Sequence, residues 1–133
     1  MRERPTGDEL LETARAVLRD ELIPALPADK RHAALMIANA LSIAARQARN
    51  GDGPEHRELA DLERLLSEPF CSKADDPASM RSALVTANRR LAQWIRSGRA
   101  DAGPLREDVR AHLADVVGHK VAESNPKYLG IKA

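Results

Sequence analysis

Residues 33–45, with the sequence AALMIANALSIAA, decide the expected fold. The segment holds only two polar residues, Asn39 and Ser42, and its alanine, leucine and methionine residues form helices well. A helix that is apolar almost all the way round is a buried helix, and small alanine side chains let neighbouring helices approach closely. We therefore expect a buried, Ala-rich central helix, against which the other helices pack.

Start and stop signals divide the rest of the chain into four further helices. Thr6 and Glu9 have the spacing of a capping box, Asp76 precedes a proline, and Asn50-Gly51 and Gly98 are stop signals. No strand-like alternation and no internal repeat occurs. The sequence predicts an all-α fold, a compact bundle of about five helices in one domain of residues 1–133, with a loose N-terminus (1–5) and a C-terminal tail (126–133). The expected helices cover approximately residues 6–23, 28–49, 54–67, 77–97 and 104–125.

Composition and charge exclude several classes of function. The 133 residues include 21 basic and 20 acidic ones, so no general attraction to nucleic acid or to anionic lipid is expected. No stretch approaches the ~20 apolar residues of a membrane span, and residues 1–12 do not resemble a signal peptide. The single cysteine, Cys71, excludes an intramolecular disulfide and a multi-cysteine metal site. We expect a cytoplasmic protein with no nucleic-acid or membrane partner.

Asn39 is the polar residue of the central helix that most needs an explanation. A buried amide without hydrogen-bond partners costs about 1–3 kcal/mol, so Asn39 either fixes the packing of neighbouring helices or contacts a ligand. His32, Asn39 and Arg46 lie seven residues apart and therefore share one strip of the helix. Asn88 borders the apolar face of the fourth helix in the same way, and an interhelical pair with Asn39 is one interpretation. A structural role is favoured for both amides.

The fifth helix carries the only residues with metal-ligand spacing. Asp108, His112, Asp115 and His119 form one stripe, and imidazoles and carboxylates can hold zinc or iron. Metal sites in helical bundles draw ligands from several helices, however, and this stripe flanks the apolar face. A solvated edge is the favoured interpretation, and we assign no metal site, no cofactor and no catalytic residue.

The apolar face of the fifth helix is expected to contain Leu105, Val109, Leu113 and Val116, with Lys120 near its middle. A lysine in such a place extends its charged end to water or pairs with a carboxylate, whereas a desolvated lysine with a lowered pKa can be catalytic. Nothing else in the sequence indicates a carbonyl substrate. Lys120 is therefore kept as a candidate polar group without an assigned role.

Four segments resemble a family of small uncharacterised bacterial proteins that is classed as a domain of unknown function. They are RPTGDELLETARAVLRDELIPALP at 4–27, RHAALMIANALSIAAR at 31–46, NRRLAQWIRSGRAD at 88–101 and HLADVVGHKVAESNPKYL at 112–129. The resemblance implies genes for aminoglycoside-phosphotransferase-like kinases and acyl-CoA dehydrogenases as frequent neighbours. It implies no catalytic residues. The polar positions of its motifs are Arg31, His32, Asn39, Asn88, Asn125 and Tyr128.

Two functional hypotheses follow. The first is a helical accessory or interaction protein without catalytic activity, which self-associates, with help from the apolar tail, or binds a phosphotransferase-like kinase or an acyl-CoA dehydrogenase. The second is a protein that binds an acyl-CoA or phosphorylated ligand, or a weak enzyme, using Arg31, His32 and Asn39. The start of a helix favours anions, which suits Arg31 and His32.

Overall fold

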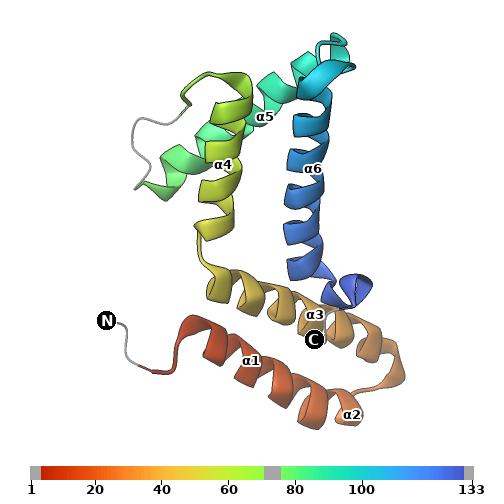
Figure 1. Ribbon diagram of the computed structural model, residues 1–133. Helices are drawn as coiled ribbons and strands as arrows, with labels where there is room; N and C mark the ends of the chain where they lie inside the picture. Colours follow the sequence, from red (N-terminus) through yellow and green to blue (C-terminus); the bar gives the residue numbers. More distant parts are fainter. Residues whose placement is uncertain (1–3, 71–75, 131–133) are drawn as a thin grey trace. The chain divides into compact units, whose positions relative to one another are not determined.

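The computed structural model describes residues 4–70 and 76–130, and every regular element in these two ranges is helical (Figure 1). The prediction of an all-α fold is confirmed. The chain divides into two compact units, Met1–Gly51 (unit 1) and Asp52–Ala133 (unit 2). The expectation of one domain stays a prediction.

Unit 1 is a pair of helices joined by a short turn. α1 (Gly7–Val17), the π-helical turn η1 (Leu18–Leu22) and α2 (Ile23–Ala25) follow one another without a break, and α3 (Ala28–Asn50) returns alongside α1. The expected capping box begins α1, where the backbone N–H of Thr6 donates to the Glu9 carboxylate at 2.8 Å. Arg49 at the end of α3 pairs with Asp8 at the start of α1, 3.3 Å apart. The two helices are therefore antiparallel.

α3 contains the expected central helix, but the expectation that it is buried almost all round is wrong within unit 1. Its buried side chains form one strip of small residues, Ala34, Ala38, Ser42 and Ala45. Met36 and Ile37 are each 56% exposed, and Asn39 is exposed as well. The reason is that α1 covers only one side of α3, and small side chains suit that close approach.

The described residues of unit 2, 52–70 and 76–130, form three longer helices and one short turn of 3-10 helix. These are α4 (Gly53–Leu66), α5 (Pro77–Arg96), α6 (Gly103–Ser124) and η2 (Pro126–Leu129). The expected start at Asp76 is confirmed, because its carboxylate accepts hydrogen bonds from the backbone N–H groups of Ala78 and Ser79. The hydrogen bond from the Ser79 hydroxyl, followed by these two backbone hydrogen bonds, holds the pKa of Asp76 below its ordinary value.

The core of unit 2 forms where α5 and α6 pack against α4. Leu62 and Met80 are its largest fully buried side chains, and the partly buried Phe70 packs against it. The buried apolar residues of this core are Leu59, Leu62, Leu66, Met80, Ala83, Leu84, Ala87, Leu91, Trp94, Ala100 and Val109.

Within residues 4–70 and 76–130, no helix is long and apolar enough to cross a membrane. Tyr128 and Leu129 of the C-terminal tail are exposed. Ile131 of the tail and Cys71 lie outside the described residues.

Candidate functional site

The buried strip of α6 differs from the expected one by a rotation of the helix. Val109 and His112 are buried, whereas Leu113 is 40% exposed and Lys120 is exposed. The prediction that Leu113 and Lys120 lie on the buried face is therefore wrong. α6 packs against α4. The buried His112 has a hydrogen-bond partner at this contact, the carboxylate of Asp61 on α4.

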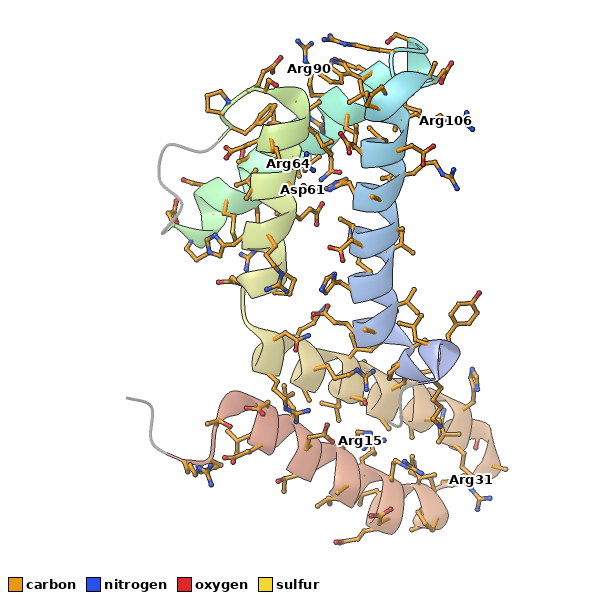
Figure 2. All side chains as sticks on the ribbon, in the orientation of Figure 1. Arg15, Arg31, Asp61, Arg64, Arg90 and Arg106 are labelled. Atoms are coloured by element: carbon orange, nitrogen blue, oxygen red, sulfur yellow. The ribbon has the colours of Figure 1, made fainter. Side chains whose placement is uncertain are left out.

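His112, Asp61 and Arg64 form a chain of charge-assisted hydrogen bonds between α6 and α4. His112 is only 3% exposed, and its Nδ1 lies 2.7 Å from Oδ2 of Asp61. Arg64 donates to Oδ1 of the same carboxylate from Nη2 at 2.6 Å and from Nε at 3.1 Å. Figure 2 shows Asp61 and Arg64 on α4. Since an ionised carboxylate only accepts, Nδ1 of His112 carries the donated proton.

The electrostatics of Asp61 follow from these contacts. Burial alone raises the pKa of this carboxyl, but the hydrogen bonds from Arg64 and His112, together with their positive charges, outweigh it and lower the pKa. Asp61 in turn raises the pKa of the Arg64 guanidinium. Asp61 is therefore held in its ionised form, and the pair orients the imidazole of His112.

An oriented Asp–His pair can serve catalysis or a metal site when the second ring nitrogen reaches a reacting group or an ion. Here Nε2 of His112 is buried and has no hydrogen-bond partner among the described residues. In that part of the chain, no three His, Cys, Asp or Glu side chains lie close enough to hold a metal ion. What the geometry supports is a link that fixes α6 against α4.

The predicted stripe of α6 is not one surface. His112 is buried, Asp108 and Asp115 are exposed, and His119 is partly exposed. His119 donates from Nδ1 to the backbone carbonyl of Asp115 at 2.9 Å. The interpretation of the stripe as a solvated edge therefore holds for Asp108 and Asp115 and is wrong for His112.

Arg31, His32 and Asn39 lie on α3 in unit 1. The Arg31 guanidinium donates to the backbone carbonyls of Leu26 at 3.0 Å and Pro24 at 3.5 Å, where α2 ends (Figure 2). Its observed contacts are thus with the chain itself. His32 and Asn39 are exposed, so the expectation of a buried Asn39 is wrong. A ligand on this strip stays a prediction.

The remaining candidate residues lie in unit 2 and do not form one cluster of contacts. Asn88 is exposed rather than buried, and its amide donates to Glu58 of α4 at 2.8 Å and to the Leu84 carbonyl at 3.1 Å. Both contacts lie within unit 2, and the structural role of Asn88 stays a prediction. Asn125 ends α6, and Tyr128 is exposed on η2.

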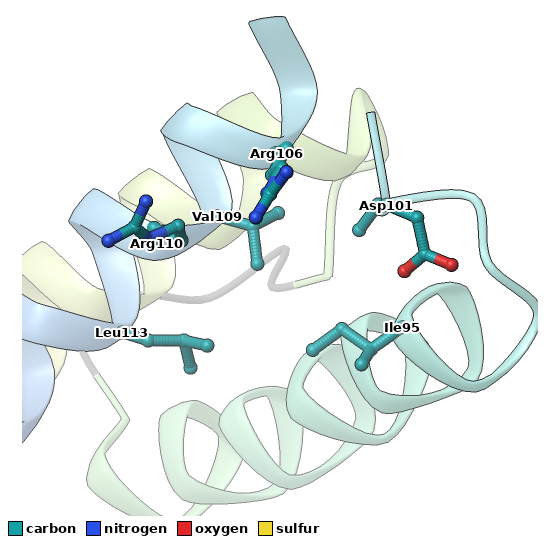
Figure 3. Close-up of a pocket in the computed structure, with 7 residues that line it drawn as sticks. Ile95, Asp101, Arg106, Val109, Arg110 and Leu113 are labelled. Carbon is teal, nitrogen blue, oxygen red and sulfur yellow. The ribbon is translucent and has the colours of Figure 1, made fainter. Parts of the chain in front are cut away.

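A groove between α5 and α6 is the other notable feature of unit 2, and no sequence motif predicted it. Its volume is about 410 Å³, and it is lined by Ile95, Ala100, Asp101, Arg106, Val109, Arg110 and Leu113. Figure 3 shows Arg110 and Leu113 toward one end, Asp101 and Ile95 toward the other, and Val109 between them. One signal was visible in the sequence: Arg106, Val109, Arg110 and Leu113 have the spacing of a single helix face.

The turn that closes this groove depends on Gly98. Gly98 has φ +76°, and a Cβ there lies 3.1 Å from Oδ2 of Asp101. We expect Gly98→Ala to lower the free energy of unfolding by about 1–2 kcal/mol, since the left-handed conformation is unfavourable for alanine. Urea denaturation followed by Trp94 fluorescence measures this change.

Gly118→Ala is the matched control for this substitution. Gly118 lies inside α6 with no neighbouring atom within 4 Å of an added Cβ, so alanine should stabilise the helix by about 0.5–1 kcal/mol. If both substitutions stabilised the protein, the backbone requirement at Gly98 would be disproved.

Comparison with known proteins identifies a family but no activity. The sequence model of one family, described as Domain of unknown function (DUF6285), matches residues 24–128. No curated protein and no solved structure shows significant similarity to the chain. The expected resemblance to a family of unknown function is confirmed.

Proposed function

Because this chain belongs to the family described as Domain of unknown function (DUF6285), which assigns no activity, we propose a function from its exposed apolar side chains. The protein is a helical interaction protein without catalytic activity of its own, and it pairs with a second copy through the helices of unit 1. The observation that carries the proposal is the number of large apolar side chains on these helices that unit 1 leaves uncovered. They are Leu10, Val17, Leu22, Leu35, Met36 and Ile37.

The small buried strip of unit 1 supports this proposal. The only buried side chains of its helices are those of three alanines and Ser42 on α3, and α1 has none. Apolar burial stabilises such a pair of helices little, because the favourable free energy is proportional to the apolar area removed from water, and alanine and serine have little of it. Pairing two hairpins into a four-helix arrangement removes the larger side chains from water.

Charge complementarity favours a second copy as the occupant of this surface. Residues 7–25 contain five acidic and two basic residues, whereas α3 contains four basic residues and one acidic residue. In a two-fold pair the same surface of both copies meets, so the acidic helix of one hairpin can face the basic helix of the other.

Ile37→Asp tests the pairing. A charge placed at this exposed apolar position should raise the dissociation constant of the dimer at least tenfold, about 1.4 kcal/mol, because the charge must lose its hydration in the interface. Sedimentation equilibrium of the full chain at several concentrations measures the constant.

Gln93→Asp is the control for this test. It adds the same charge at an exposed position of α5, outside the helices of unit 1. Equal weakening by both variants would indicate a general charge effect, and a wild-type chain that stays monomeric at every concentration would disprove the pairing.

The family resemblance extends the proposal to a partner. We place the dimer beside an aminoglycoside-phosphotransferase-like kinase or an acyl-CoA dehydrogenase, as an accessory to it. Mixing the purified protein with each candidate enzyme and measuring co-elution tests this part separately. Absence of co-elution with both would remove the enzyme partner and leave the self-association intact.

A further inference from the structure

The groove of unit 2 combines an apolar interior with cationic side chains from one helix. Ile95 of α5 and Val109 and Leu113 of α6 supply its apolar walls, and Ala100 is buried at the turn between the helices. Its volume of about 410 Å³ lies within the range of pockets that hold small molecules, roughly 300–1,000 Å³. A groove of this kind suits an aliphatic chain.

The charged residues of the groove define the rest of the ligand. Arg106 and Arg110 are one turn apart on α6, and both line the groove. Arg106 makes no hydrogen bond or ion pair with any described residue, while Arg110 has only a loose contact with Glu107 at 3.8 Å, in which both side chains are exposed. Two guanidinium groups with unused donors match a carboxylate, which arginine binds through parallel hydrogen bonds.

Asp101 adds selectivity because of its position. Figure 3 shows it at the end of the groove away from Arg110, near Ile95. No ion pair joins Asp101 to another described residue. A second anionic group at that end of a ligand would meet this carboxylate and be repelled.

We propose that the groove between α5 and α6 binds an aliphatic monocarboxylate of medium chain length. Arg110 holds the carboxylate at the end of the groove away from Asp101, and Arg106, one turn away on α6, adds a second positive charge. The chain lies across Val109 toward Ile95. Asp101 disfavours a dicarboxylate of the same length. This site is separate in sequence from the self-association surface of unit 1, so each can fail without the other.

Titration of the full chain with decanoate tests the site. Trp94 is the only tryptophan and shares the buried core with Ala100 and Val109, so its fluorescence reports binding. Decanoate should bind at least tenfold more tightly than decan-1-ol, which lacks the charge, and more tightly than decanedioate, which has a second one. Equal binding of decanoate and decan-1-ol would overturn the proposal, as would no binding of decanoate.

Variants separate the arginine site from general apolar binding. The double variant R106Q/R110Q should weaken decanoate binding at least tenfold, whereas Arg89→Gln, an exposed arginine of α5 outside the groove lining, should leave it unchanged. Equal affinities of wild type and R106Q/R110Q would contradict the assignment. Circular dichroism checks that each variant is folded. The affinity for decanoate should be unchanged in Ile37→Asp, which would show that the groove binds its ligand independently of the proposed pairing.

Discussion

Leu62→Ala is expected to lower the free energy of unfolding of unit 2 by about 2–5 kcal/mol, the largest effect among the substitutions considered. Leu62 is 0% exposed and lies in the core that α4 shares with α5 and α6. Its truncation removes buried apolar atoms and leaves a cavity that rigid helices fill only in part. Because Trp94 belongs to the same core, urea denaturation followed by its fluorescence measures the loss.

Val85→Ala provides the comparison for Leu62→Ala. Val85 lies on α5 in the same unit but is half exposed, so the substitution should change the free energy of unfolding by less than about 0.5 kcal/mol. A loss below 1 kcal/mol for Leu62→Ala would show that the packing of α4 in the core is looser than described.

Asp61→Ala is expected to cost about 1–3 kcal/mol, because it leaves Nδ1 of the buried His112 without its acceptor. His112→Leu should cost less, since it removes the buried polar group together with the need for a partner. The double variant D61A/H112L should therefore be about as stable as His112→Leu alone. Urea denaturation of the three variants gives the coupling between the two residues.

Asp115→Ala is the control for the aspartate, because Asp115 is exposed on α6 and should matter little. If Asp61→Ala and Asp115→Ala had equally small effects, the hydrogen bond to His112 would not stabilise the protein. If D61A/H112L lost more free energy of unfolding than Asp61→Ala and His112→Leu lose together, the proposed coupling would have the wrong sign.

The lowered pKa of Asp61 gives the pair a defined pH dependence. A carboxyl whose pKa is lower in the folded state stabilises the protein above its unfolded-state value, 3.8 for aspartate, and this contribution is lost as the pH falls through the folded value. Asp76 and Asp8 contribute with the same sign. Wild-type protein should therefore lose more stability on acidification below pH 4 than Asp61→Ala does, which denaturation at a series of pH values measures.

The surroundings of the candidate residues were harder to predict than the helices. A structural role was expected for Asn88, but its observed partner Glu58 is 30 residues away, and the sequence offered several carboxylates for it. The groove escaped prediction because Ile95 and Leu113 belong to different helices, and only the turn at Gly98 brings them to one surface.

The sequence by itself determined the helical class and the ends of the helices, because these depend on neighbouring residues. Helices begin at the capping box of Thr6 and Glu9 and at Asp76 before a proline. They end beside Gly51 and Gly98, which have positive φ. Only the tertiary structure decided which face of each helix is buried. Residues 33–45 are apolar on almost every side, yet only one strip of them is buried, where α1 covers α3. On α6, His112 is buried instead of Leu113 because Asp61, which is 51 residues away in the sequence, lies opposite it. Burial depends on what stands across from a side chain, and helical periodicity cannot show that.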